Sequence, residues 1–346
     1  MMHSFVCPRD ERGVCFCTSL VENQTLMRIL SGIQPSGKLH VGNYFGMMKP
    51  VLELQLQGEA YIFIATYHAL TTVDDPEVLR TYTRDVALDF LACGLDPQKT
   101  AFYRQSDVPE ITELTWLLSC LTPMGLLERC HSFKDKTSRG IAASHGLFSY
   151  PVLMAADILA VQSDCVPVGR DQKQHVEVTR DLAQKFNSQY GPVFKIPEAV
   201  IRDEVATVPG VDGQKMSKSY NNTIEMFGSA KERKKRIMRM VTDSKGLEDP
   251  KDPDTCNIFA LYRLLATPEE QTALATAYRA GGMGYGDAKK ALAELFEAHF
   301  APFREKREAL ANDPGYVEDV LQDGARRARR EAAATLQQAR HAVGLE

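Results

Sequence analysis

Short apolar runs and amphipathic stretches alternate along the first two thirds of the chain. The apolar runs are rich in β-branched and aromatic residues and predict strands at 27–33, 60–66, 100–105 and 165–168. Helical spacing of apolar residues predicts helices at 42–57, 76–94, 109–130, 151–163 and 174–186. Strands that alternate with helices in this way indicate an α/β fold built on a doubly wound parallel sheet.

The pattern changes after Ser219, where strand signals become few. Helices are predicted at 229–242, 256–266, 268–280, 287–312 and 316–342, so a separate all-helical domain is expected at 223–346. Residues 1–26 show neither a helical nor a strand period, and they lack the continuous apolar region of a signal peptide. We expect them to be a disordered extension, or the product of an upstream start codon, with the ordered protein beginning near Met27.

The composition is that of a soluble globular protein with two domains. The chain has 346 residues, of which 44% are hydrophobic and 25% are charged, and its net charge is −4. This charge argues against a general nucleic-acid binder but is compatible with a local basic patch. None of the eight cysteines forms a C-x-x-C pair, which predicts a reduced cytoplasmic protein without a zinc or redox motif. No apolar run reaches the roughly 18 residues that a membrane span requires.

One loop concentrates groups that bind anions. Two ammonium groups and two hydroxyls lie within the five residues Lys215-Met216-Ser217-Lys218-Ser219. Gly210 and Gly213 precede them, so the loop can move and bring its backbone close to a phosphate. Taken alone, however, the segment is better explained as a solvated surface cluster.

A second polar motif follows the first predicted strand. Residues 32–38 spell G-x-x-x-x-G-K, but Leu39 stands where a phosphate-binding loop needs Ser or Thr to hold magnesium. The next residues are His40-Val41-Gly42-Asn43, at the predicted start of a helix. Here an imidazole and a carboxamide can hydrogen-bond a nucleotide, and Gly42 lets an adenine ring lie against the backbone. Taken alone, this motif is an ordinary polar helix start.

Together, the two motifs resemble the signatures of the class I aminoacyl-tRNA synthetases in order, spacing and structural context. Three further stretches resemble the bacterial type of the tryptophanyl-tRNA synthetase family: Ser31-Gly32-Ile33-Gln34-Pro35-Ser36-Gly37, Tyr150-Pro151-Val152-Leu153-Met154-Ala155-Ala156-Asp157-Ile158-Leu159 and Val166-Pro167-Val168-Gly169-Arg170-Asp171-Gln172-Lys173-Gln174-His175. The resemblance runs from Met27 to near the C-terminus. It implies a Rossmann-like catalytic domain at 27–222, with a helical insertion at about 109–150 and a mobile signature loop at 210–222, and a helical anticodon-binding domain at 223–346.

The resemblance also implies the reaction. L-tryptophan is expected to react with ATP and Mg²⁺ to give the adenylate and pyrophosphate, and then to be transferred to the 2′-hydroxyl of the terminal adenosine of tRNA(Trp). The implied catalytic residues are Gln34, His40, Asn43, Lys215 and Lys218. The residues implied for ATP binding are Gln34, Pro35, Ser36, Gly42, Asn43, Lys136, Gly169, Arg170, Asp171, Val208, Lys215, Met216, Ser217, Lys218 and Ser219.

Asp157 is the residue expected to select the amino acid. It interrupts an otherwise apolar helix, and a carboxylate that faces a pocket needs a donor such as an indole N–H, which can only donate. A carboxylate that caps a backbone or pairs with a lysine is the structural alternative. The resemblance implies that tryptophan is bound by Tyr150, Met154, Asp157, Val166 and Val168, with His68 and Gln172 beside them.

Partner surfaces are predicted in the helical part. A contact with tRNA phosphates is expected from Lys231, Arg233, Lys234, Lys235, Arg236 and Arg239, although a solvated helix face explains the same charges. The family is usually a homodimer, and neither DNA nor a membrane is an expected partner. Some relatives hold an iron–sulfur cluster on four cysteines; here only Cys256 matches, and the stretch 280–286 has no cysteine, so no cluster and no protein-held metal are expected.

Two other functions remain open at this level. A tyrosyl-tRNA synthetase shares the fold and both signatures, although the segment Met154-Ala155-Ala156-Asp157 fits an indole better than a phenol. A regulatory paralogue would bind tryptophan without charging tRNA, which the intact signatures and the apparently complete helical domain argue against.

Overall fold

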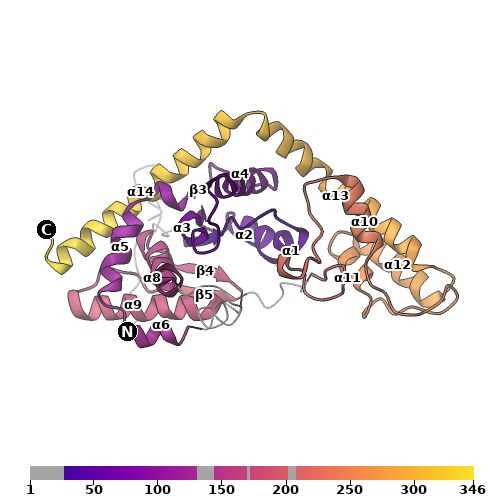
Figure 1. Ribbon diagram of the computed structural model, residues 1–346, viewed down its shortest axis with the longest axis horizontal. Helices are drawn as coiled ribbons and strands as arrows, with labels where there is room; N and C mark the ends of the chain where they lie inside the picture. Colours follow the sequence, from indigo (N-terminus) through magenta and orange to yellow (C-terminus); the bar gives the residue numbers. More distant parts are fainter. Residues whose placement is uncertain (1–26, 131–143, 170–171, 202–207) are drawn as a thin grey trace, which may run out of the picture.

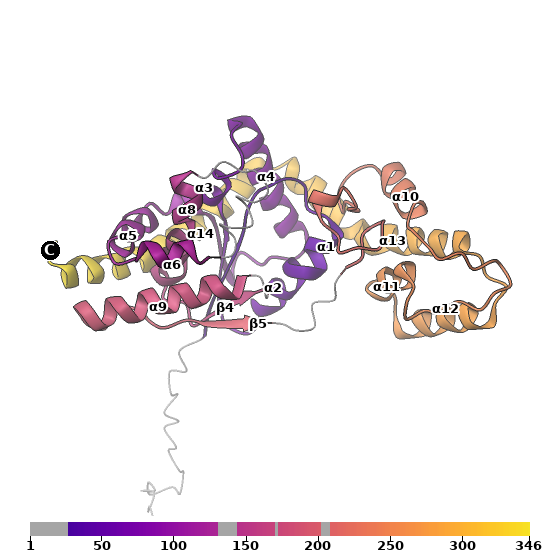
Figure 2. The ribbon, with the colours of Figure 1, turned by 60° about the horizontal axis from the view of Figure 1, so that its bottom comes forward.

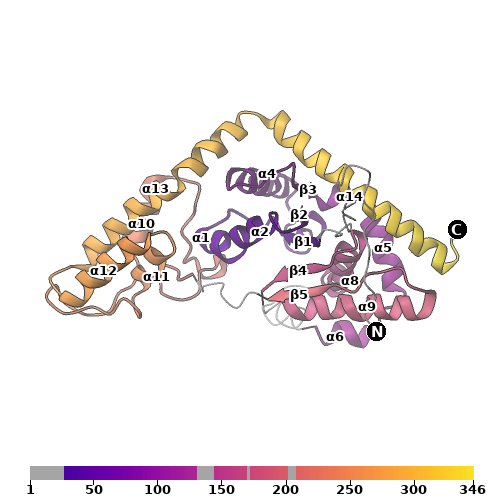
Figure 3. The same ribbon diagram turned by 180° about the vertical axis from the view of Figure 1, so that it is seen from behind.

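A five-stranded parallel sheet forms the centre of the protein, in the strand order β3-β2-β1-β4-β5 (Figures 1 and 3). The computed structural model describes residues 27–130, 144–169, 172–201 and 208–346. The strands are β1 (Arg28–Ile33), β2 (Glu59–Ile64), β3 (Thr100–Arg104), β4 (Cys165–Val168) and β5 (Glu198–Ile201). The four predicted strands are therefore confirmed. The fifth was not predicted, because β5 is only four residues long and directly follows Pro197.

Helices surround the sheet and continue beyond it (Figure 2). Those of the first two thirds are α1 (Val41–Asn43), α2 (Lys49–Leu54), α3 (Thr66–Ala69), α4 (Pro76–Ala92), α5 (Glu110–Ser119), α6 (Met124–Glu128), α8 (His145–Ala160) and α9 (Lys173–Tyr190). The later ones are α10 (Ala230–Met238), α11 (Asn257–Arg263), α12 (Pro268–Ala280), α13 (Tyr285–Ala311) and α14 (Pro314–Val343). Two short 3₁₀ turns are η2 (Gln105–Asp107) and η4 (Lys218–Tyr220). None of the described helices is long and apolar enough to span a membrane.

The helix predicted at 42–57 is not continuous. A π-helical turn, η1 (Tyr44–Met48), separates α1 from α2. Pro50 lies in the first turn of α2 and cannot donate a backbone hydrogen bond to the preceding turn. The widened turn before it is the local adjustment that the missing donor requires.

The sheet is buried on both faces, which explains the unbroken apolar run at 60–66. Alternate residues of β2 enter different clusters: Tyr61 and Phe63 pack with α5, α8 and α9, whereas Ile62 and Ile64 pack on the side of α4. A strand with two covered faces has no solvent side on which polar residues could alternate. The continuous run therefore indicated a central strand.

The last helix differs from the expected separate bundle. Helices α13 and α14 form an elbow above α4, and α14 returns to the sheet and packs along β3 (Figure 1). Arg327 donates to the backbone oxygens of Pro97 (2.9 Å) and Thr100 (3.1 Å). The small residues Ala325, Ala328 and Ala332 are buried on this side of α14 and allow the close approach. The C-terminal helix thus covers an edge of the sheet that would otherwise be exposed.

Gly324 marks the closest point of this contact. A β-carbon at this position would lie 2.0 Å from the carbonyl oxygen of Phe102, which belongs to the backbone of β3. We expect Gly324→Ala to lower the free energy of unfolding by about 2 kcal/mol, because the helix must move away from the strand. Gly286→Ala on α13 is the matched control, since nothing lies within 4 Å of a β-carbon there. Urea unfolding of both variants measures the difference, and equal stabilities would contradict the expectation.

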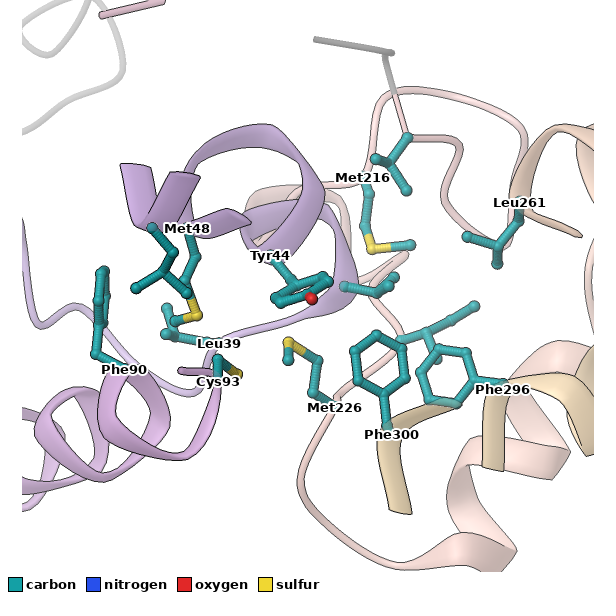
Figure 4. Close-up of a cluster of buried hydrophobic side chains, with 14 of the residues drawn as sticks. Leu39, Tyr44, Met48, Phe90, Cys93, Met216, Met226, Leu261, Phe296 and Phe300 are labelled. Carbon is teal, nitrogen blue, oxygen red and sulfur yellow. The ribbon is translucent and has the colours of Figure 1, made fainter. Parts of the chain in front are cut away.

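A cluster rich in methionine joins the signature segments to the helical part (Figure 4). Tyr44 and Met48 enter it from the helix that follows the first signature, and Met216 enters it from the second. Phe296 and Phe300 of α13 close it from the other side, with the Tyr44 and Phe300 ring centroids 5.3 Å apart. We call the segment Lys215–Ser219 the lysine loop. Its position is therefore coupled by packing to that of α13.

Candidate functional site

A cavity of about 390 Å³ opens where the strand order reverses. The chain runs from β1 outward to β3 and then returns to place β4 on the other side of β1, so the loops after β1 and β4 diverge. Open α/β sheets bind ligands in the crevice at this point. The residues predicted to bind the amino acid all line this cavity, and we name it the amino-acid cavity after that prediction. They are Tyr150, Met154, His68, Asp157, Val166, Val168 and Gln172.

Asp157 lies on α8 and is 1% exposed. His68 Nε2 is 2.9 Å from its Oδ2, and Gln105 Nε2 donates to both carboxylate oxygens at 2.8 and 2.9 Å. Burial raises the pKa of Asp157, and the hydrogen bonds from His68 and Gln105 oppose the rise. Within the described residues, the hydrogen-bond partners of Asp157 are His68 and Gln105, and neither a backbone cap nor a lysine pair is present there.

Gln105 is a site residue that the sequence analysis missed. It is fully buried, and its Oε1 accepts a hydrogen bond from the backbone N–H of Tyr67 at 2.9 Å. This bond directs the amide nitrogen of Gln105 toward Asp157. The signal was present in the sequence, because Gln105 ends the third apolar run at the same sheet edge as His68. A polar residue at the carboxyl end of a parallel strand is a candidate site residue, because ligands bind at that edge of the sheet.

Tyr150 and Gln34 complete the polar part of the cavity. The Tyr150 hydroxyl lies 2.8 Å from His175 Nε2, which joins α8 to α9. Gln34 Nε2 donates to the backbone oxygen of His68 (3.0 Å) and to Thr72 (3.2 Å). Gln34 therefore lines the amino-acid cavity, and its predicted contact with ATP stays a prediction.

His40 and Asn43 hold each other across the start of α1. The Asn43 backbone N–H donates to His40 Nδ1 at 3.3 Å, and the His40 backbone N–H donates to Asn43 Oδ1 at 3.1 Å. His40 is buried, and burial, with a smaller effect of the Lys218 charge, lowers its pKa to about 4. The ring accepts at Nδ1, so we assign the neutral form with the proton on Nε2.

The pKa of His40 predicts a pH-dependent stability. Its folded value of about 4 lies below the ordinary 6.5, so the unfolded chain binds more protons between these values and stability falls as the pH falls through this range. His40 should contribute about 3 kcal/mol at neutral pH that is lost by about pH 4. Urea unfolding at several pH values should show the stability of the wild type falling toward that of His40→Asn. His341→Asn, at an exposed position, is the control, and a pH-independent difference between wild type and His40→Asn would contradict the assignment.

The lysine loop is a hairpin-like segment held by Asn222. The Met216 N–H donates to the Val208 carbonyl (2.9 Å), and the Ser217 N–H donates to Asn222 Oδ1 (2.8 Å). Asn222 is 1% exposed and also donates to the carbonyl of Lys215 at 3.1 Å. Val208 and Met216 are buried, whereas Lys215 and Lys218 remain exposed. The loop thus anchors its apolar residues and leaves its ammonium groups accessible.

The two signatures meet in space. The Val41 N–H donates to the carbonyl of Ile224, just beyond the lysine loop, at 3.0 Å. A β-carbon at Gly42 would lie 3.2 Å from Met216 Cβ, and one at Gly37 would lie 3.3 Å from Lys218 Nζ. The missing side chain of Gly42 leaves room for the His40 ring, whose Nδ1 would lie 2.9 Å from such a β-carbon, and for Met216. Lys218 therefore reaches the turn that follows β1.

The charge environment of Lys218 includes two acids that the sequence did not single out. Partial desolvation lowers the pKa of Lys218, although the side chain as a whole is exposed, and Asp89 and Glu225 act in the opposite direction. Asp89 on α4 is 2% exposed and accepts from Arg307 Nε of α13 at 2.5 Å. Burial raises the pKa of Asp89 to about 7. An ion pair between the two parts of the chain thus lies close to the lysine loop.

The basic helix α10 divides into two sets of residues. Arg233 is 4% exposed, pairs with Glu297 at 2.7 and 2.8 Å and donates to the Gly228 carbonyl. The expectation that Arg233 contacts RNA fails for this reason, since it holds α10 against α13. Arg236 donates to Asn221 next to the lysine loop. Lys231, Lys234, Lys235 and Arg239 are exposed.

Part of the predicted ATP-binding set lies outside the described residues. Lys136, Arg170 and Asp171 lie outside the described residues, as does the side chain of Ser219. Pro35 is buried and Ser36 is exposed on the turn after β1, and Gly169 lines the amino-acid cavity. Cys256 lies 3.6 Å from the Tyr278 hydroxyl, and the described part of the chain contains no cluster of three potential metal ligands.

Known proteins resemble this chain along most of its length. The profile of the family of class I tRNA synthetases for W and Y matches residues 22–301. A tryptophan–tRNA ligase of Rhodopirellula baltica is 57% identical over 319 residues, which are 92% of this chain and 100% of the relative. One of Fusobacterium nucleatum is 54% identical over 321 residues, covering 92% of this chain and 98% of the relative. The crystal structure of tryptophanyl-tRNA synthetase from Campylobacter jejuni complexed with ADP and tryptophan is 51% identical, with a TM-score of 0.89 over 92% of this chain and 100% of that chain.

Proposed function

The chain belongs to the class I tRNA synthetases for tryptophan and tyrosine, as a tryptophan–tRNA ligase of the bacterial type, and from this premise we propose how its residues divide the reaction. The enzyme activates L-tryptophan with ATP to tryptophanyl-adenylate and pyrophosphate, and transfers tryptophan to the terminal adenosine of tRNA(Trp). The observation that carries the proposal is the buried Asp157 carboxylate in the wall of the amino-acid cavity, oriented by Gln105 and His68.

The indole ring is assigned to the amino-acid cavity. Asp157 would accept the indole N–H, and Met154, Val166 and Val168 would contact the faces of the ring. Gln105 and His68 already occupy part of the hydrogen-bonding capacity of the carboxylate, so its orientation is set before the substrate arrives. Tyr150, Gln34 and Gln172 would contact the polar groups of the substrate at the mouth of the cavity.

The nucleotide is assigned to the turn after β1 and to the lysine loop. His40 would contact the phosphates through Nε2–H. Further contacts with ATP would come from Pro35, Ser36, Gly42, Asn43, Gly169 and Val208. ATP would enter with Mg²⁺, which neutralises part of the phosphate charge. Lys136, Arg170, Asp171 and Ser219 keep their predicted roles in ATP binding.

The first chemical step needs alignment rather than a general base. The tryptophan carboxylate is already a nucleophile; its oxygen attacks the α-phosphorus, and the bond to the β-phosphate oxygen breaks as pyrophosphate leaves. Lys215 and Lys218 would stabilise the charge that develops on the pyrophosphate. The buried Met216 would hold the loop while the two ammonium groups contact the leaving group. In the second step the 2′-hydroxyl of the tRNA adenosine attacks the activated carbonyl and AMP leaves.

A single exchange experiment tests the assignment. In an ATP–pyrophosphate exchange assay with each of the twenty amino acids, only tryptophan should support rapid exchange. In a parallel charging assay, labelled tryptophan should appear on tRNA(Trp). Exchange with tyrosine at a comparable rate would contradict the proposed reading of the cavity. Exchange without transfer would indicate a protein that has lost tRNA charging.

The tRNA surface is assigned to the exposed part of α10. Lys231, Lys234, Lys235 and Arg239 remain in the proposed set, Arg236 is shared with the lysine loop, and Arg233 is excluded. The double variant Lys231→Glu/Lys234→Glu should weaken tRNA binding about tenfold and reduce its salt dependence, because phosphate contacts release counterions. The rate of adenylate formation should not change. An unaltered salt dependence of tRNA binding would exclude α10 from the tRNA interface.

We further propose that the protein acts as a homodimer in the cytoplasm.

A further inference from the structure

A second cavity lies on the other side of α3 from the amino-acid cavity. Its volume is about 490 Å³, and it is lined on one side by residues of α4 and on the other by residues of α13 and α14. Figure 1 shows these two helices forming an elbow above α4. We name the cavity the elbow cavity. Its apolar wall consists mainly of Leu79, Leu88, Leu310, Pro314, Val317 and Leu321. A volume in this range and a largely apolar wall are typical of sites for small molecules.

The charges at the elbow cavity are mostly positive. Arg80, Arg84 and Arg104 line it, against the single carboxylate of Glu318. Arg104 pairs with Glu318 and Asp107, and Arg80 pairs with Glu77. Arg84 donates to the Ala311 carbonyl at 3.2 Å, and within the described ranges it makes no ion pair. Because a guanidinium has five N–H donors, Arg84 can still bind an anion.

We propose that the elbow cavity binds a small amphipathic anion, in which an apolar body packs between α4 and the elbow while a carboxylate or sulfonate pairs with Arg84. The largely apolar wall argues against a nucleotide, because the hydroxyls of its sugar and the polar edge of its base would be left without partners there. Nothing in the activation or transfer of tryptophan requires this cavity, so its ligand is a separate one.

Helix α3 and the turn η2 lie between the two cavities and contact residues of both. Thr66, Tyr67 and Ser106 line the elbow cavity. Ser106 N–H donates to Thr66 Oγ1 at 3.0 Å, and Tyr67 N–H donates to Gln105 Oε1 at 2.9 Å, so α3 and η2 form one hydrogen-bonded unit. The opposite side of this unit carries His68 and Gln105, which hold Asp157.

Occupancy of the elbow cavity should therefore raise the affinity for tryptophan. A ligand that packs against Tyr67 and Thr66 restricts the motion of α3 and η2, so less ordering remains to be done when tryptophan binds. We expect about a fivefold decrease in the tryptophan Kd, and by reciprocity an equal effect of tryptophan on the ligand. This coupling rests on the proposed role of Asp157, whereas occupancy of the cavity does not.

The test uses anilinonaphthalene sulfonate, which has an apolar body and one sulfonate, with the full-length protein. A fluorescence titration is made with tryptophan and a non-hydrolysable ATP analogue at saturation, so that the amino-acid cavity is already filled. Saturable binding of the probe is expected. Arg84→Glu should weaken it about tenfold because the sulfonate loses its positive partner, and Leu310→Trp should weaken it about tenfold because the larger side chain fills the cavity. The matched controls are the exposed positions Arg279→Glu and Leu56→Trp.

The outcomes separate clearly. Binding that is sensitive to Arg84→Glu and Leu310→Trp but not to the controls supports the site, provided that all variants keep the wild-type melting temperature and exchange rate. Absence of saturable binding, or binding that neither variant changes, overturns it. Displacement of the probe by tRNA, with matching loss of tRNA affinity in both variants, would assign the cavity to RNA and also overturn it. Calorimetric titration with tryptophan, with and without the probe, measures the coupling; an unchanged Kd would refute the coupling alone.

Discussion

Replacing Lys218 by alanine is expected to slow the formation of tryptophanyl-adenylate about 100-fold or more. Lys218 Nζ approaches the turn after β1 closely, where the phosphates are proposed to lie. Desolvation lowers the pKa of Lys218, and the charges of Asp89 and Glu225 oppose this effect. The lysine would act on the leaving pyrophosphate, whose charge develops in the transition state. Its removal should therefore reduce kcat/KM for activation rather than ground-state binding of the amino acid.

Tryptophan affinity should be nearly unaffected in the same variant, within about twofold. Lys218 does not line the amino-acid cavity, and its loop is anchored separately by Met216 and Asn222. Pre-steady-state adenylate formation and calorimetric titration with tryptophan measure the two quantities. Lys290→Ala, at an exposed position on α13, is the control. Adenylate formation at the normal rate in Lys218→Ala would exclude the lysine from the chemistry.

Replacing Asp157 by alanine is expected to reduce the preference for tryptophan over phenylalanine by about 100-fold. A site that pairs with a substrate N–H rejects analogues that lack it, because the buried acceptor would be left without a donor. With alanine, Gln105 and His68 lose their shared partner, and the cavity then selects mainly by size and shape. The ratio of kcat/KM values in the exchange assay measures the change.

Two further variants separate recognition from folding in this region. Asp157→Asn keeps the shape and one acceptor oxygen but removes the charge, so it should fall between wild type and Asp157→Ala in selectivity. Asp323→Ala, on the exposed side of α14, should leave selectivity unchanged. A ratio for Asp157→Ala equal to that of wild type, in a protein with an unchanged melting temperature, would show that the indole N–H is read elsewhere.

Much of the site could be located from sequence because its residues follow strand ends. His68, Val168 and Gly169 stand at or just after the carboxyl ends of apolar runs, and these ends meet at one edge of a parallel sheet. Gln105 satisfies the same rule, but its burial and its role as a partner of another side chain are not visible in the local sequence. Its partner Asp157 is 52 residues away, so the pairing exists only after the sheet and α8 have packed.

The helical part was less accessible to the same reasoning. Five helices are present where five were expected in 229–342, but the pattern of apolar residues could not show what each helix packs against. Helix α14 has small residues on one side, which suits a close contact with any backbone, and the fold directs it to β3. The buried Arg233 looks the same in sequence as the exposed Lys234, because burial depends on Glu297 of another helix.

The parallel sheet, the two signatures and the family could be inferred from the amino-acid sequence, since they depend on local periodicity and on short motifs in a fixed order. The folded protein was needed to show that Lys218 meets the turn after β1, that Gln105 and His68 orient Asp157, and that residues of the α13–α14 elbow and of α4 line a second cavity. Each of these depends on distances between segments far apart in the chain. Such distances are set by how the two clusters on either side of the sheet pack, and no local pattern encodes them.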